Sequence, residues 1–124
     1  MIDYKLTGAE ENLTNLIWEN EPIKSSELVK ICASEFKWKK STTYTMLKKL
    51  EEKKIVQNRN SIVESLIIKE DFYGEQSKIF VEDNFEGSLP KFIAAFTRRK
   101  KLDKKEVHEL QRLIDDYTRR GYDG

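Results

Sequence analysis

One cysteine, one histidine and the lack of any long apolar run set the first limits on what this chain can be. Because Cys32 is the only cysteine, the 124 residues hold no intrachain disulfide and no multi-cysteine metal site. No apolar stretch reaches the roughly 18 residues that cross a bilayer, and the first residues lack a signal-peptide pattern. We therefore expect a soluble, cytoplasmic protein without membrane insertion.

Catalysis also finds little support in the residue types present. The single histidine, His108, falls on the polar side of a predicted helix with no nucleophile marked beside it, and no glycine-rich phosphate loop occurs. Cys32 falls on the apolar face of another predicted helix, where a small buried thiol is the ordinary interpretation. We expect a protein that is not an enzyme and that needs no cofactor or metal.

Charge is abundant but unevenly distributed along the chain. Charged residues make up 36% of the sequence and hydrophobic residues 38%, while the net charge is only +1. Residues 1–36 contain three bases and seven acids, and residues 37–59 contain eight bases and two acids. Residues 60–97 again contain three bases and seven acids, and residues 98–124 contain nine bases and six acids. Segments of alternating sign favour an oriented docking surface. The limited core material favours a dimer, in which a partner subunit supplies further burial.

The first half of the chain has the pattern of three helices. Thr7, with a glutamate three residues later, has the spacing of a capping box. Ser25 or Ser26 can cap a second helix, and a third opens near Ser41.

Two short strands follow these helices. Residues 55–57 and 62–68 are rich in β-branched side chains, and residues 58–61 supply the turn between them. We therefore expect residues 1–69 to form a winged helix-turn-helix domain that binds DNA.

The third helix, from Trp38 to Lys54, is the most informative stretch. Its core-facing positions, spaced i, i+3, i+4 and i+7, are Thr43, Met46, Leu47 and Leu50. Hydroxyls and methyl groups that we expect to read or approach bases are Ser41, Thr42, Tyr44 and Thr45. Cations that we expect to hold phosphates are Lys39, Lys40, Lys48, Lys49 and, in the turn between the strands, Arg59. The alternative is an ordinary solvated amphipathic helix.

Residues 70–124 are expected to form three further helices. The first spans residues 71–85, Pro90 fits the first turn of the second, and Asp103 can cap the third. Their large apolar residues are Phe80, Phe85, Leu89, Phe92, Phe96, Leu110, Leu113, Ile114 and Tyr117. We expect these residues to form a two-fold homodimer interface that places two reading helices on successive half-sites of a palindrome. The alternative is that the three helices pack back on the first domain.

The whole pattern predicts a mainly α protein with a small β-hairpin, and its motifs resemble the penicillinase and methicillin-resistance repressors over nearly the whole chain. The motifs are L-x-x-L-I-W at Leu13–Trp18, Trp38 followed by T-x-x-T-M-L-x-x-L at Thr42–Leu50, Asp71-Phe72, Gly87-Ser88-Leu89, Ala95-Phe96, and Leu102-Asp103 through Glu109-Leu110. Their order and spacing together carry the resemblance.

The resemblance implies a dimeric transcriptional repressor with a winged helix-turn-helix domain and a C-terminal helical dimerisation domain. It implies binding to palindromic, inverted-repeat operators in double-stranded DNA, of genes for β-lactam antibiotic resistance. It further implies inactivation by cleavage in the dimerisation domain, through a membrane sensor metalloprotease, at a bond that falls here on Ala95–Phe96.

The sequence departs from the family in three places. Its hairpin is shorter than the usual wing, Lys39-Lys40-Ser41 replaces a frequent Ser-Pro-Lys, and the C-terminal cysteines of related copper-responsive repressors are absent. Two other functions stay open from the sequence. One is a winged-helix regulator of other genes that responds to a small ligand, and the other is a winged-helix adaptor that binds proteins instead of DNA.

Overall fold

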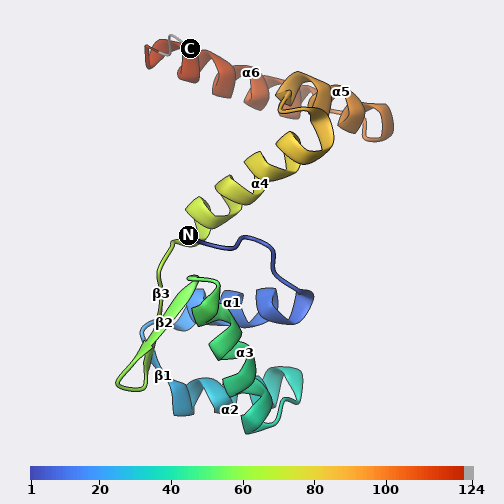
Figure 1. Ribbon diagram of the computed structural model, residues 1–124. Coiled ribbons are helices and arrows are strands. Elements are labelled where there is room, and N and C mark those ends of the chain that lie inside the picture. Colours follow the sequence, from blue (N-terminus) through green and yellow to red (C-terminus); the bar gives the residue numbers. More distant parts are fainter. Residues whose placement is uncertain (122–124) are drawn as a thin grey trace. The chain divides into compact units, whose positions relative to one another are not determined.

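The computed structural model describes residues 1–121, and the chain divides into two compact units, residues 1–79 and residues 80 onward. Within the described residues, six helices and a three-stranded antiparallel sheet confirm the expected mainly α fold with a winged helix (Figure 1). The unit boundary falls inside the fourth helix, α4 (Lys69–Phe85), which begins two residues earlier than the sequence pattern predicts.

The first unit contains the helix-turn-helix and the sheet. Its elements are α1 (Gly8–Asn20), β1 (Ile23–Lys24), α2 (Ser25–Phe36), α3 (Lys40–Glu52), β2 (Val56–Arg59) and β3 (Ile62–Ser65), followed by the start of α4. The capping box predicted at Thr7 is confirmed, because the Thr7 hydroxyl accepts the Glu10 N–H and the Glu10 carboxylate accepts the Thr7 N–H.

The prediction that Ser25 or Ser26 caps α2 is wrong. The residue at the N-cap position is Lys24, which makes no side-chain cap bond, and Ser25 is the buried first residue of the helix. The physical reason is β1, a two-residue strand in which Lys24 pairs with Ile62. Because the chain leaves this strand directly into α2, the cap position is set by strand pairing and not by a capping side chain.

The sheet has the order β1-β3-β2, with both pairs antiparallel. The turn predicted at residues 58–61 is narrower than expected, since Asn58 and Arg59 belong to β2. Only Asn60 and Ser61 form the turn, with φ angles of 52° and 65°. Two consecutive residues in the left-handed region are typical of the two-residue hairpin turn that matches the twist of the strands.

The buried core of the described chain lies entirely in the first unit. Its apolar members are Leu13, Ile17, Leu28, Cys32, Leu47, Leu50, Ile55, Val56, Val63 and Phe72. Phe72 comes from α4 and packs against the rings of Tyr4 and Trp18, at centroid distances of 5.4 and 5.5 Å. The Trp18 indole N–H donates to the Ile67 carbonyl at 3.0 Å, so α1 is fixed to the segment that leads into α4.

An almost fully buried carboxylate joins α1 to the end of α3. Lys53 Nζ lies 2.8 Å from Glu10 Oε1 and also donates to the Lys5 carbonyl at 2.6 Å. Burial by itself raises the pKa of Glu10, but the hydrogen bond from Lys53 and those from Thr7 outweigh it and hold the pKa below its ordinary value. The pair therefore carries charge at neutral pH and contributes to the stability of this unit.

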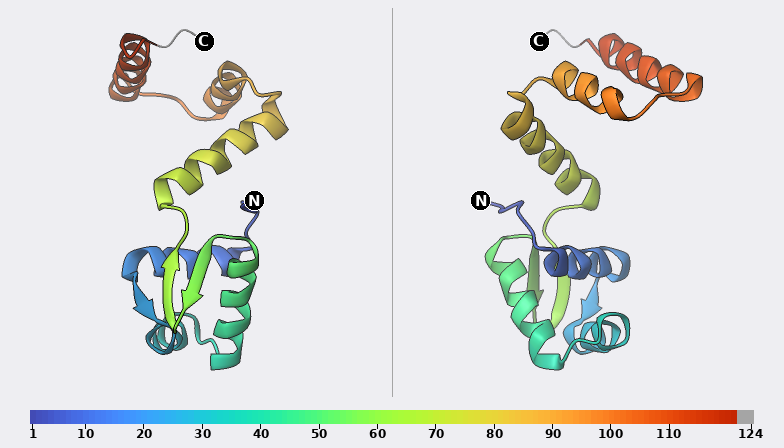
Figure 2. Two further views of the ribbon diagram at one scale, coloured as in Figure 1. Left: turned by 60° about the vertical axis from the view of Figure 1, so that its left-hand side comes forward. Right: turned by 90° about the vertical axis from the view of Figure 1, so that its right-hand side faces the viewer.

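The second unit contains the end of α4, then α5 (Leu89–Arg99) and α6 (Lys104–Arg119), shown from two sides in Figure 2. The predicted capping box at Asp103 and Glu106 is confirmed, and Pro90 lies in the first turn of α5. Phe80, Phe85 and Phe92 form a small ring cluster with centroid distances from 5.4 to 6.0 Å. No residue of α5 or α6 is buried, although both helices have a marked apolar side.

The turn between α2 and α3 depends on one strained residue. Lys37 ends α2 with φ 61° and ψ 29°, the left-handed conformation that favours glycine. Its N–H and that of Trp38 both donate to the Cys32 carbonyl, and the Phe36 and Trp38 rings pack at 5.0 Å.

We expect Lys37→Gly to raise the free energy of unfolding by about 1 kcal/mol, because glycine adopts this conformation without a Cβ clash. The midpoint of urea unfolding at unchanged slope measures the gain. Lys37→Ala, which removes the charge and keeps the strain, is the matched control and should change stability little. Equal effects of the two substitutions would contradict the strain account.

We expect Glu10→Gln to lower the free energy of unfolding at pH 7 by about 1.5 to 3 kcal/mol, the range for a hydrogen bond to a charged group. Since the folded-state pKa of Glu10 is depressed, its contribution is fully present above the ordinary value of 4.5 and is lost as pH falls through the folded-state pKa. Urea unfolding of both proteins between pH 7 and pH 3 should show the difference shrinking on acidification. Glu19→Gln, an exposed site on the same helix, is the control.

Candidate nucleic-acid interface

Helix α3 separates a buried side from a charged, solvent-exposed side. Thr43, Leu47 and Leu50 are buried as predicted, and Met46 is half-buried against the core. The opposite side is exposed and carries Lys40, Ser41, Thr42, Thr45, Lys48 and Lys49. Because the core holds one side of this helix, the exposed hydroxyls and amines have a fixed arrangement along the helix surface.

Tyr44 differs from the other predicted reading residues. It is half-buried against the core, and its hydroxyl donates to the Ser25 hydroxyl at 3.3 Å. The ring therefore connects α3 to the first residue of α2. Its location indicates a positioning role for the helix-turn-helix, which sequence spacing alone gave no reason to expect.

The start of α3 has an unusual charge arrangement. Lys39 occupies the N-cap position and Lys40 the first turn, which contains no acidic residue, and no side chain caps the helix. The N-terminus of a helix has a partial positive charge and unpaired N–H groups, so lysines there cost stability while an anion is favoured. Both lysines are exposed. This end of α3 is thus suited to a phosphate group.

The hairpin is attached to the start of α2. The Ser25 N–H donates to the Ser61 carbonyl at 2.8 Å, which fixes the turn beside the helix-turn-helix. Arg59 is exposed at the end of β2, directly before this turn. Exposed Lys24 lies on the other edge strand, β1, and pairs with Ile62 as Arg59 does from β2, so it adds a cation at this end of the sheet that sequence reasoning missed. From the sequence alone, a single lysine between Ile23 and Ser25 gives no indication of a DNA contact, because its position depends on the pairing of β1 with β3.

The remaining reactive groups of the described chain form no second chemical centre. Cys32 is buried, which raises the pKa of its thiol and keeps it neutral. His108 is exposed on α6. Among residues 1–121 there is no group of three or more His, Cys, Asp or Glu side chains that could hold a metal ion. None of the helices described is long and apolar enough to cross a membrane.

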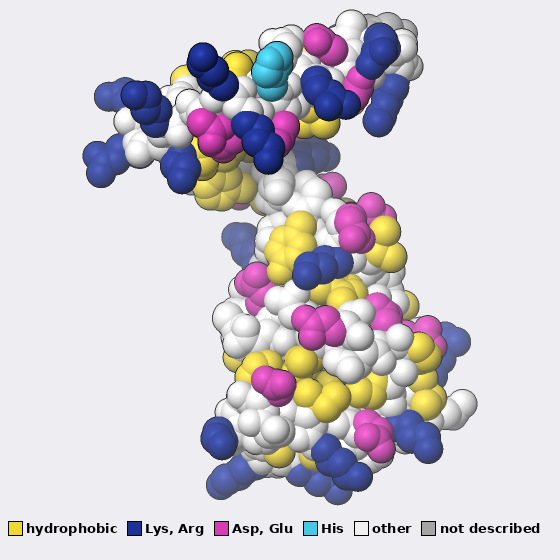
Figure 3. All heavy atoms as spheres, turned by 180° about the vertical axis from the view of Figure 1, so that it is seen from behind, with side chains coloured by type: hydrophobic (Ala, Val, Ile, Leu, Met, Phe, Trp, Pro, Cys, Tyr) yellow, Lys and Arg dark blue, Asp and Glu magenta, His cyan; other side chains and the backbone are white. Residues whose placement is uncertain are grey.

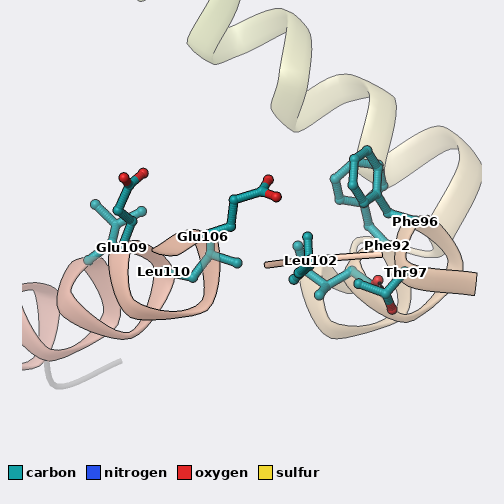
Figure 4. Close-up of a pocket in the computed structure, with 9 residues that line it drawn as sticks. Phe92, Phe96, Thr97, Leu102, Glu106, Glu109 and Leu110 are labelled. Atoms are coloured by element: carbon teal, nitrogen blue, oxygen red, sulfur yellow. Dashed lines mark hydrogen bonds between the residues drawn. The ribbon is translucent and has the colours of Figure 1, made fainter. Parts of the chain in front are cut away.

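The predicted pairing residues of the second unit remain largely exposed. Leu113 is 67% exposed, Leu89 and Ile114 58%, Tyr117 54%, and Phe80 50%. A groove of about 470 Å³ runs between α5 and α6. It is lined by Phe92, Ile93, Phe96, Thr97, Leu102, Glu106, Glu109, Leu110 and Leu113. Figure 4 shows the Phe92 and Phe96 rings and the Glu106 and Glu109 carboxylates extending to the same side.

The bond between Ala95 and Phe96 lies inside regular helix. The Phe96 carbonyl accepts the Lys100 N–H at 3.0 Å, and the Phe96 side chain is 46% exposed at the groove. A protease that binds its substrate in extended form would have to unwind the last turns of α5. Since no residue of α5 is buried, little packing within one chain opposes such unwinding.

The sequence matches the family described as penicillinase repressor over residues 6–116. A penicillinase repressor of Staphylococcus aureus is 22% identical over 120 residues, which cover 94% of this chain and 95% of that protein. A penicillinase repressor of Bacillus licheniformis is 22% identical over 120 residues, which cover 94% of each chain. Because the family match runs through both units and spans most of the sequence, the chain belongs to the penicillinase repressor family.

Proposed function

We propose that the protein is a cytoplasmic, homodimeric transcriptional repressor that binds inverted-repeat operators in double-stranded DNA. The observation that carries the proposal is the exposed side of α3, with three lysines and three hydroxyls, and a fourth lysine at the N-cap, on a helix whose other side is held by the core. Membership of the penicillinase repressor family supports the same function.

The roles follow from the chemistry of each side chain. Ser41, Thr42 and Thr45 are short donors and acceptors that approach base edges in the major groove. The phosphate-binding cations are Lys39, Lys40, Lys48, Lys49 and Arg59, with Lys24 added at the sheet edge. Tyr44 acts through Ser25 as a positioning residue that holds α3 against α2.

In the proposed dimer, the first unit of each chain binds DNA and the second unit pairs with the second unit of the other copy. The exposed apolar residues of α4, α5 and α6 and the groove between α5 and α6 supply the surface for a second copy. A two-fold pair presents two α3 helices to the two halves of a palindrome. Binding of the first half-site raises the effective concentration of the second reading helix, so two weak contacts act as one strong contact.

Induction is by cleavage in the second unit. A membrane sensor metalloprotease leads to cutting at Ala95–Phe96, and the genes released are those of β-lactam resistance. Cutting there separates α6 from the reading helices and divides the groove, since Phe92 and Leu110 lie on opposite sides of the bond. The DNA-binding unit stays intact, but it binds as a single copy.

We expect Lys48→Ala combined with Lys49→Ala to weaken binding to every duplex by a similar factor. The slope of log K against log salt concentration should become shallower by about 1.8 per chain, because each lost phosphate contact releases one fewer counterion. Fluorescence anisotropy on a random-sequence duplex and on duplexes selected from a random pool measures both quantities.

The matched control removes the same charge from other elements of the first unit. Lys5→Ala with Lys69→Ala changes exposed lysines of the N-terminal segment and of α4. This control should keep the slope of the unchanged protein. If the α3 variant and the control have the same slope, the phosphate contacts assigned to Lys48 and Lys49 are wrong.

We expect Leu113→Glu to convert the dimer to a monomer and to lower the affinity for a two-half-site duplex by about 100-fold or more, as loss of avidity predicts. Sedimentation equilibrium and titration of one-half-site and two-half-site duplexes measure the two effects. Gln111→Glu, an exposed position on the same helix, is the control. A monomeric variant that binds the two-half-site duplex with full affinity would contradict pairing as the source of affinity.

A further inference from the structure

A second concentration of positive charge lies in the unit assigned to dimerisation. Six of the eight residues 98–105 are lysine or arginine, and one is acidic. The second basic cluster consists of Arg98, Arg99, Lys100, Lys101, Lys104 and Lys105. It spans the end of α5, the connecting segment and the first turn of α6. Neither base reading by α3 nor apolar pairing accounts for it.

All six cations are exposed and lack a partner within residues 1–121. None of them makes an ion pair or a side-chain hydrogen bond there. The one acid among them, Asp103, accepts the Glu106 N–H at 2.8 Å in the capping box, so it serves the helix start. By contrast, Lys91 in the same unit contacts Glu86 at 2.9 Å, and Arg119 contacts Asp116.

Helix position accounts for two of the six cations in the second basic cluster and disfavours two others. Arg98 and Arg99 lie in the last turn of α5, where the helix dipole favours cations. Lys104 and Lys105 lie in the first turn of α6, where the dipole disfavours them and favours an anion. Unlike the start of α3, the start of α6 has carboxylates of its own, because Asp103 caps it and Glu106 lies in its first turn. Six neighbouring like charges also repel one another, which an external polyanion relieves.

The surroundings of the second basic cluster favour a row of phosphates over a lipid surface. The apolar residues nearest in sequence are Phe96, Leu102 and Val107. Phe96 and Leu102 line the groove between α5 and α6, which leaves Val107, an aliphatic residue that is 52% exposed, as the apolar neighbour outside the groove. Membrane-surface sites combine cations with apolar anchors that enter the lipid, whereas duplex DNA requires only cations along its backbone. Figure 3 shows lysine and arginine side chains projecting from the second unit on the face in view.

We propose that the second basic cluster binds the phosphate backbone of duplex DNA without sequence preference, as a contact separate from that of α3. This inference rests on the proposed DNA-binding function. The contact adds affinity and salt dependence on any duplex and leaves discrimination between sequences to α3. Since the cluster begins two residues beyond Phe96, cleavage at Ala95–Phe96 cuts it from the reading helix together with α6.

The test is a four-lysine variant of the full chain, Lys100→Gln, Lys101→Gln, Lys104→Gln and Lys105→Gln. On a random-sequence duplex we expect the slope of log K against log salt to become shallower by about 3 to 4 per chain, and the affinity at 150 mM salt (about physiological) to fall about tenfold or more. The preference for selected over random duplex should not change. Circular dichroism and sedimentation equilibrium establish that the variant keeps its fold and oligomeric state.

The matched control removes four cations from other positions of the second unit: Lys91→Gln, Arg112→Gln, Arg119→Gln and Arg120→Gln. Its salt slope should equal that of the unchanged protein. Equal slopes for the four-lysine variant and the control would overturn the proposal. So would loss of sedimentation with phosphatidylglycerol vesicles together with an unchanged DNA slope, which would assign the cluster to a membrane surface instead.

The result also separates this inference from the proposed function. A shallower slope for the four-lysine variant with no effect of Lys48→Ala and Lys49→Ala would support the second basic cluster and reject the phosphate contacts assigned to Lys48 and Lys49. A slope that responds to the α3 variant alone would leave the repressor function in place and reject the cluster as a DNA contact.

Discussion

Burial of apolar side chains within one chain is confined to the first unit, and this leaves the second unit with apolar surface in water. All ten buried apolar residues of the described chain lie in the first unit, while α5 and α6 contain none. Burial of apolar surface contributes roughly 25 cal/mol of free energy per Å², and this contribution is missing for surface that stays in water. A partner surface that covered exposed residues such as Leu113 and Ile114 would therefore stabilise these helices. In the proposed dimer, a second copy of the chain is that surface in self-complementary form.

The first unit, in contrast, is held together within one chain. The Glu10–Lys53 pair joins α1 to the end of α3, Tyr44 joins α3 to α2, and the Ser25 N–H joins α2 to the hairpin turn. These links hold α3 in place. The lysines at the N-terminus of α3 lower its stability, because that end of the helix already has a partial positive charge. A rigid scaffold that tolerates such unfavourable charges is typical of a binding site, where the ligand supplies the missing counter-charge.

Sequence reasoning succeeded where the determinants are local. The capping boxes at Thr7 and Asp103 depend on residues three positions apart, and the buried side of α3 depends on helical periodicity, so both were predictable. Prediction from the sequence failed where the structure depends on contacts between segments far apart in the chain. Lys24 replaces Ser25 at the start of α2 because β1 pairs with β3, which no local pattern indicates. Most of the candidate site was likewise predictable from periodicity and charge. The half-buried location of Tyr44 and the inclusion of Lys24 required the tertiary contacts.

In the proposed repressor, two copies of this chain read two halves of one DNA site. A hydroxyl-radical footprint of the purified full chain, on the DNA upstream of its own gene, tests this arrangement. We expect two protected segments related as an inverted repeat, with centres about 10 base pairs apart or a multiple of that spacing. Two chains should be bound per protected site. Protection of a single half-site by one chain, or no protection at low salt, would contradict it.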